Sequence, residues 1–136
     1  MQERALAVTE AALGPDHPDT ALCLGNLART FSARGRHAEA LPLDERALVV
    51  AEEALGPDHP RTATRLNNLA VTYSDLGPYA EALPLQERAL AGTEAALGPD
   101  HPDTTLRLGN LADTYRAVGR AADAAALLQH AHRGAL

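Results

Sequence analysis

Aspartate followed by histidine occurs three times in this chain, and side chains of these two types can bind a metal ion or transfer a proton. The pairs belong to one hexapeptide, Leu-Gly-Pro-Asp-His-Pro, which spans residues 13–18, 55–60 and 97–102. A copy recurs every 42 residues, so an array of repeats carries one imidazole per repeat. Adjacent repeats lie much farther apart than the roughly 2 Å of a zinc–nitrogen bond. The pattern therefore predicts no shared metal site, and no cofactor is expected.

The hexapeptide is better explained as a connector between two helices. Gly14 suits the left-handed position just after a helix, and Pro15 prevents the helix from continuing. Pro18 fits the first turn of the next helix, where its missing N–H costs nothing. Asp16 is chemically the better N-cap, whereas a proline at the first helical position would place the cap at His17. The sequence leaves these two alternatives open.

No other residue pattern indicates catalysis. The chain has no Gly-rich phosphate loop, no HExxH motif and no nucleophile elbow. Cys23 is the single cysteine, and no neighbouring base or helix N-terminus is predicted to activate its thiol. His130 and His132 are two positions apart on a predicted helix, so they point to different faces. We therefore expect a protein that is not an enzyme.

The composition excludes several classes of partner. A formal charge of −6 argues against general binding of nucleic acid or of an anionic membrane. No apolar stretch approaches the roughly 20 residues that span a bilayer, and residues 1–4 do not resemble a signal peptide. A single cysteine fits a reducing compartment. We expect a cytoplasmic protein, and the use of Arg without Lys is typical of a GC-rich bacterial genome.

The apolar residues predict pairs of helices. The hydrophobic fraction is 46% but aromatic residues make up 3%, so Ala and Leu must fill the interior. Apolar residues recur at helical spacing on both sides of Gly35, Gly77 and Gly119. In the first block the predicted helices cover 18–34 and 37–55. No alternating run of β-branched residues indicates a strand, so the predicted fold class is all-α.

The period divides the chain into repeats within one domain. The predicted repeats are 14–55, 56–97 and 98–136. Residues 1–13 match residues 85–97, which end a repeat, so they are predicted to form an N-terminal half repeat. A chain that begins within a repeat is interpreted as a fragment of a longer array.

Within one block, the apolar pattern resembles the tetratricopeptide repeat. In the second block the matching residues are Leu66, Leu69, Ala70, Tyr73, Gly77, Tyr79, Ala82, Ala89 and Leu90. The 42-residue period, the connector, and the segments LNNLA (66–70) and EALPL (81–85) are similar to the kinesin-light-chain-like subgroup, which is also common in bacterial regulatory proteins. The resemblance covers the whole chain. It implies a right-handed α-solenoid of antiparallel helix pairs, whose first helices line the concave side.

Some positions depart from the family pattern or from helix preference. The family usually places a bulky residue four positions after the alanine of the second helix, but this chain has Asp44 and Gln86, with Leu128 in the third block. We expect weaker packing there, or positions closer to solvent. Pro42 and Pro84 lie within predicted second helices, where each should cause a slight bend or leave a solvated carbonyl.

The resemblance also indicates where a ligand would bind. Asn26, Asn68 and Asn110 are in register on the first helices and would form a ladder along the groove. An Asn amide both donates and accepts hydrogen bonds, so it can bind any peptide main chain, as Asn does in related tetratricopeptide proteins. The alternative is that these residues brace neighbouring helices. The full set of predicted groove residues is Asn26, Arg29, Asn67, Asn68, Asp75, Asn110, Asp113 and Arg116.

The charged members of this set would select the ligand by charge, or would form only a solvated face. Their mixed signs predict no uniformly basic groove. Kinesin light chains favour acidic peptides, but that preference is not carried over, because the lysines of a basic clamp are missing.

Two functions fit the sequence. The first is a non-catalytic protein–protein interaction module or scaffold, which holds a peptide or partner helix in the concave groove as part of a bacterial regulatory protein. The second is a structural module that forms homo-oligomers through its terminal helices, because no polar capping helix follows the last repeat.

Overall fold

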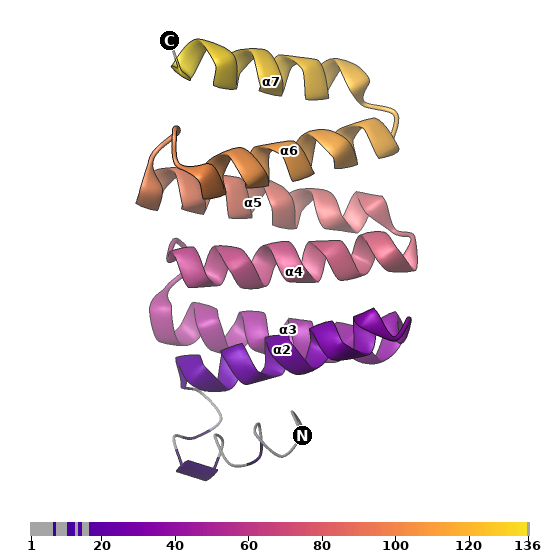
Figure 1. Ribbon diagram of the computed structural model, residues 1–136, viewed down its shortest axis with the longest axis vertical. Coiled ribbons are helices and arrows are strands. Elements are labelled where there is room, and N and C mark those ends of the chain that lie inside the picture. The colour runs from indigo at the N-terminus through magenta and orange to yellow at the C-terminus, as the bar shows by residue number, and fades with distance from the viewer. Residues whose placement is uncertain (1–6, 8–10, 13, 15–16, 136) are drawn as a thin grey trace.

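The computed structural model of the protein describes residues 7, 11–12, 14 and 17–135, with side chains up to residue 129. The predicted half repeat at residues 1–13 therefore falls largely outside the described residues. From residue 17 onward the regular elements are α-helices (Figure 1). They are α2 (Pro18–Ala33), α3 (His37–Leu55), α4 (Pro60–Leu76), α5 (Tyr79–Leu97), α6 (Pro102–Ala117) and α7 (Ala121–Ala135).

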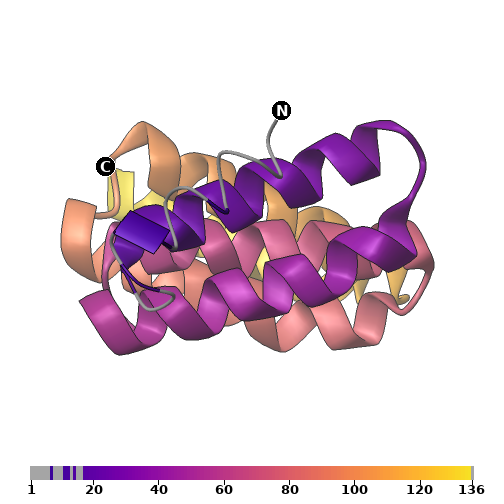
Figure 2. The same ribbon diagram turned by 90° about the horizontal axis from the view of Figure 1, so that it is seen from below.

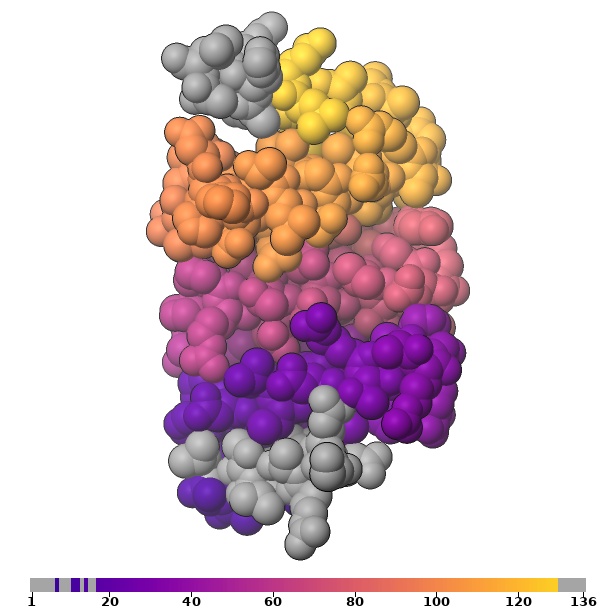
Figure 3. Space-filling view, viewed as in Figure 1, coloured from indigo at the N-terminus to yellow at the C-terminus, as the bar shows by residue number. Residues whose placement is uncertain are grey.

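The helices stack in chain order into a solenoid. Each packs against the next, and the first helices of neighbouring repeats, α2 and α4, also touch. A view along the stack shows the helices lying one behind another (Figure 2). In the space-filling view, successive repeats form contiguous bands along the long axis (Figure 3). The predicted all-α repeat solenoid is confirmed.

Ala and Leu fill the interior, as the composition predicts. The central cluster contains Leu48, Ala63, Leu66, Leu69 and Ala89, which come from α3, α4 and α5. Leu66 is 0% exposed. Because three helices from two repeats meet in this cluster, the solenoid is held together mainly by contacts between adjacent helices.

The connector contains a histidine cap. The Nδ1 atom of His59 accepts a hydrogen bond from the backbone N–H of Arg61 at 3.0 Å, and His17 and His101 make the equivalent bond at 3.1 Å. A side-chain acceptor at this position satisfies one of the unpaired N–H groups at a helix start. The cap is therefore the histidine and not the aspartate, which decides between the two alternatives that the sequence leaves open.

A buried threonine also holds each connector, and the sequence analysis did not predict it. The hydroxyl of Thr62 donates to the carbonyl oxygen of Gly56 at 2.8 Å, and the threonine is 0% exposed. Gly56 has a φ of 91°, a conformation that glycine adopts without steric cost. Thr20 and Thr104 make the same bond to the preceding glycine at 2.7 Å. This buried hydrogen bond joins the end of one helix to the start of the next.

The two prolines lie within continuous helices. Pro42 is inside α3 and Pro84 is inside α5. The carbonyl groups that they leave without a helical donor belong to Ala38 and Ala80, which are both exposed residues. Whether each proline bends its helix or leaves a solvated carbonyl stays a prediction.

The expectation that Asp44 and Gln86 lie nearer to solvent was wrong. They are 3% and 4% exposed, whereas Leu128 is 37% exposed. Asp44 accepts a hydrogen bond from the hydroxyl of Thr72 at 2.5 Å, so this position of α3 faces the first helix of the next repeat. Its burial follows from the stacking of repeats and does not depend on the residue type.

Because of this burial, replacement of Asp44 by Asn should stabilise the fold at neutral pH. Burial raises the pKa of Asp44, while the hydrogen bond from Thr72 and the charge of Arg65 act in the opposite direction. A carboxyl whose pKa is higher in the folded state binds its proton more tightly there, so its charged form destabilises the fold above that pKa. The penalty disappears as the pH falls below the ordinary value of about 3.9.

We expect Asp44→Asn to raise the melting temperature at about pH 7 and to lose this advantage as the pH approaches about 4. Thermal unfolding followed by circular dichroism over this range measures the effect. Glu45→Gln, on the neighbouring exposed residue, is the control. An Asn variant that melts below the wild type at neutral pH would contradict the prediction.

Candidate peptide-binding groove

A groove of about 540 Å³ opens between the first helices α2, α4 and α6. We call it the first-helix groove. Helix α3 contributes two residues to the lining, His37 and Asp44. The lining residues are Arg29, Ser32, Ala33, His37, Asp44, Asn67, Asn68, Val71, Thr72, Asp75, Leu106 and Arg107.

The structure brings half of the predicted groove residues together. Arg29, Asn67, Asn68 and Asp75 line the first-helix groove. The remaining four lie on the first helices outside its lining: Asn26, Asn110, Asp113 and Arg116. Asp113 and Arg116 form an exposed ion pair with each other at 3.1 Å. This pair agrees with the alternative that these charges form a solvated face.

The three ladder residues have different environments. The Nδ2 atom of Asn110 donates to Oδ1 of Asn67 at 3.2 Å, so this Asn braces α6 against α4. Asn68 is half-buried, and its Nδ2 atom has no partner in the described residues. Asn26 is exposed. The three residues are in register in the sequence, yet their environments differ. Only the second block has an asparagine just before the ladder residue, namely Asn67, so only Asn110 has such a partner in the preceding repeat.

Two arginines that the sequence analysis did not select reach from one first helix toward the preceding one. Arg107 donates from Nη2 to the hydroxyl of Thr64 at 3.3 Å, and its Nε atom is buried without a partner in the part of the chain that the structure describes. Arg65 extends over Gly25, where an added Cβ would lie 1.7 Å from Nη1. That Nη1 atom is also buried and has no hydrogen-bond partner in the described residues. Glycine at position 25 thus leaves the space that the guanidinium group occupies.

Burial is the largest influence on both guanidinium groups and lowers their pKa values. The charge of Asp44 opposes this shift for Arg65, and the charge of Asp103 opposes it for Arg107. In the sequence, Arg65 and Arg107 are equivalent positions, and Cys23 stands there in the first block. This alignment by itself does not indicate which residues they contact.

The groove carries charges of both signs. Arg29 and Arg107 lie in the same lining as Asp44 and Asp75. Asp75 is also 3.6 Å from Nδ1 of His37, measured from its Oδ2 atom. This mixture agrees with the prediction that the groove is not uniformly basic.

Neither a cluster of metal ligands nor a membrane-spanning helix occurs among the described residues. No group of three or more His, Cys, Asp or Glu residues there is arranged to hold a metal ion. In the same part of the chain, no helix is long and apolar enough to cross a membrane.

Comparison with known proteins identifies the family. The tetratricopeptide repeat family matches residues 1–48, 32–92 and 66–136, which together span the sequence. The chain is a tetratricopeptide repeat protein. Repeats of this family generally mediate protein–protein interaction. A comparison with curated protein sequences finds no significant match.

Solved structures place this tetratricopeptide repeat protein in the kinesin-light-chain-like subgroup. It is similar to a putative kinesin light chain from Podosopora anserina with nearly identical TPR-like repeats, at 28% identity and a TM-score of 0.88. It is also similar to BtubC (BKLC) from P. vanneervenii, at 26% identity and a TM-score of 0.86. The alignments cover 96% and 97% of this chain, but 62% and 53% of those chains.

Proposed function

We propose that this tetratricopeptide repeat protein is a non-catalytic interaction module or scaffold that holds a peptide or partner helix in its concave first-helix groove. We further propose that it acts in the bacterial cytoplasm as part of a larger regulatory protein. The proposal rests on two hydrogen-bond donors that have no acceptor among the described residues, namely Nδ2 of Asn68 and Nε of Arg107, whose side chains both line the groove.

A buried donor without an acceptor costs about 1–3 kcal/mol, so a ligand that supplies acceptors gains affinity from the site. The main chain of a peptide presents carbonyl oxygens whatever its sequence. A rotation of the Asn68 amide or the Arg107 guanidinium would bring such donors to a ligand carbonyl. The groove is thus suited to bind a peptide backbone.

Apolar side chains in the groove would contact the side chains of the ligand. Val71 is 43% exposed and Leu106 is 55% exposed, and both belong to the lining. Exposed apolar residues beside polar ones are typical of binding surfaces. The proposed ligand therefore combines apolar side chains with an accessible main chain, as an extended peptide or an amphipathic helix does.

Replacement of Asn68 by Ala is expected to weaken peptide binding about tenfold, which corresponds to the loss of one or two hydrogen bonds. A peptide selected from a random displayed library on the wild-type protein serves as the ligand, and calorimetry measures its Kd. Asn26→Ala is the matched control, because Asn26 is in register with Asn68 but outside the groove lining.

Circular dichroism should show unchanged helicity for both variants. The triple variant Asn26→Ala, Asn68→Ala and Asn110→Ala should bind no more weakly than Asn68→Ala when fully folded. Equal affinity of wild type and Asn68→Ala would rule out the proposed role of the groove.

Self-association through the terminal helices stays a prediction. Residues 1–13 lie largely outside the described residues, and so do the side chains from residue 130 onward.

A further inference from the structure

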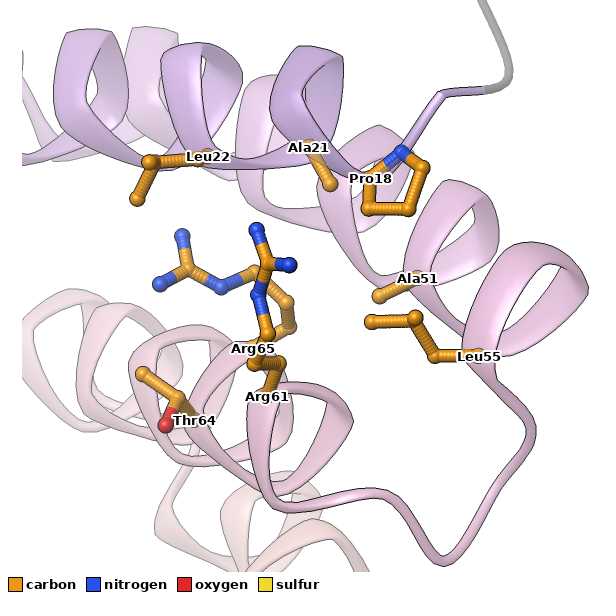
Figure 4. Close-up of a pocket in the computed structure, with 8 residues that line it drawn as sticks. All are labelled: Pro18, Ala21, Leu22, Ala51, Leu55, Arg61, Thr64 and Arg65. Carbon is orange, nitrogen blue, oxygen red and sulfur yellow. The ribbon is translucent and has the colours of Figure 1, made fainter.

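A second, smaller pocket lies between α2 and α4, beside the connector, and shares no lining residue with the first-helix groove. Its volume is about 140 Å³. We call it the α2–α4 pocket. Its lining residues are Pro18, Ala21 and Leu22 from α2, Ala51 and Leu55 from α3, and Arg61, Thr64 and Arg65 from α4 (Figure 4).

Two guanidinium groups enter this pocket from one wall. The side chains of Arg61 and Arg65 extend from α4 toward α2, and apart from Thr64 the other lining side chains are apolar (Figure 4). Arg61 approaches Asp19 at 3.5 Å, and both side chains of this pair are about half exposed. The Nη1 atom of Arg65 is buried against Gly25 and has no acceptor among the described residues. The lining of the pocket therefore combines two guanidinium groups with an apolar surface and contains no carboxylate.

The next repeat contains an equivalent pocket, which allows a comparison within one chain. Its lining residues are Pro60, Arg61, Thr64, Thr93, Leu97, Asp103 and Arg107. Six of these seven have a counterpart 42 positions earlier in the α2–α4 pocket, and the seventh, Arg61, stands where the first repeat has Asp19 outside the lining. In this second pocket Asp103 replaces Arg61, and threonines replace Leu22 and Ala51.

In the second pocket, residues of the lining itself compensate the charge and the hydrogen-bonding capacity of Arg107. Arg107 donates to the hydroxyl of Thr64, and the carboxylate of Asp103 acts on its charge. In the first pocket Leu22 stands in place of Thr64, so no hydroxyl is available there to Arg65. The carboxylates that act on its guanidinium groups, Asp19 on Arg61 and Asp44 on Arg65, lie outside its lining. Two pockets built on the same backbone therefore differ in charge and polarity, and the first has the chemistry of a site for an anion with an apolar body.

We propose that the α2–α4 pocket binds a small aliphatic carboxylate. The carboxylate accepts hydrogen bonds from Arg61 and Arg65, whose planar groups match its geometry. The aliphatic body packs against Leu22, Ala51 and Leu55. A cavity of about 150 Å³ holds a benzene molecule, so the pocket accommodates a branched body of about five carbons. Such a group comes either from a free branched-chain acid or from the C-terminal residue of a peptide.

Titration of the ¹⁵N-labelled full chain with small probes tests the proposal. Isovalerate represents the free acid, N-acetyl-leucine represents a peptide C-terminus, and N-acetyl-leucinamide lacks the carboxylate. We expect at least one of the two acids to shift the backbone resonances of Leu22, Ala51 and Arg65, and the acid that binds identifies the source. Equal shifts from the amide, or no shifts from either acid, would overturn the proposal.

Residues borrowed from the other blocks provide variants that retain the fold. Arg61→Asp introduces the residue that stands at positions 19 and 103, and should weaken binding of the acid about tenfold through loss of a charged hydrogen bond. Leu22→Thr introduces the residue at position 64 and should weaken it about threefold through loss of apolar contact. Arg88→Asp, on α5, is the charge-matched control. Wild-type affinity in Arg61→Asp would overturn the site.

Discussion

Replacement of Leu66 by Ala is expected to lower the free energy of unfolding by about 2–5 kcal/mol. Leu66 is 0% exposed and lies in the cluster where α3, α4 and α5 meet. The substitution leaves a cavity that rigid neighbouring helices fill incompletely. Domains have a total stability of about 5–15 kcal/mol, so this one change should remove a large part of it.

Urea denaturation followed by circular dichroism measures this loss. Leu106→Ala is the control, because Leu106 lies on the next first helix with 55% of its surface exposed. We expect the control to change stability by less than about 0.5 kcal/mol. Similar losses for both variants would mean that the repeats do not share a packed core.

Replacement of Thr62 by Val is expected to cost about 1–3 kcal/mol. Valine keeps the shape of the side chain but removes the hydroxyl that donates to Gly56 at 2.8 Å. The same hydroxyl lies 3.4 Å from the carbonyl oxygen of Ala51. Without it, the end of α3 loses its connection to the start of α4 inside a buried site.

The matched change is Thr105→Val on α6. Thr105 also donates to a carbonyl oxygen, that of His101, but its side chain is exposed, so water can replace the lost bond. We expect this variant to lose less than about 0.5 kcal/mol in the same urea titration. If Thr62→Val lowers the free energy of unfolding as little as Thr105→Val does, the buried hydrogen bond does not stabilise the connector.

The order and extent of the helices could be predicted because they depend on local features. A proline at the first helical position, a glycine after the last one, and apolar residues at helical spacing all act within a few residues of one another. The predicted second helix of the first repeat, 37–55, agrees with α3, and the first one extends one residue beyond the observed end of α2 at Ala33. The 42-residue period then implies the stacking.

The candidate site could be predicted only in part. Of the residues predicted on the first-helix face, Arg29, Asn67, Asn68 and Asp75 line the first-helix groove, and their role in binding stays a prediction. Arg107 and Asp44 were not selected, although both also line it. Their positions depend on the neighbouring repeat, because Arg107 reaches Thr64 and Asp44 reaches Thr72.

The repeat, its helices and its connector can thus be inferred from residue order, since each depends on contacts between residues close in the chain. The hydrogen-bond partners of the polar side chains cannot be inferred from residue order. Asn68 and Asn110 occupy equivalent positions, yet Asn110 braces α6 against α4, whereas the amide nitrogen of Asn68 has no partner among the described residues. The difference comes from residues of the adjacent repeat, which packing alone brings within hydrogen-bonding distance.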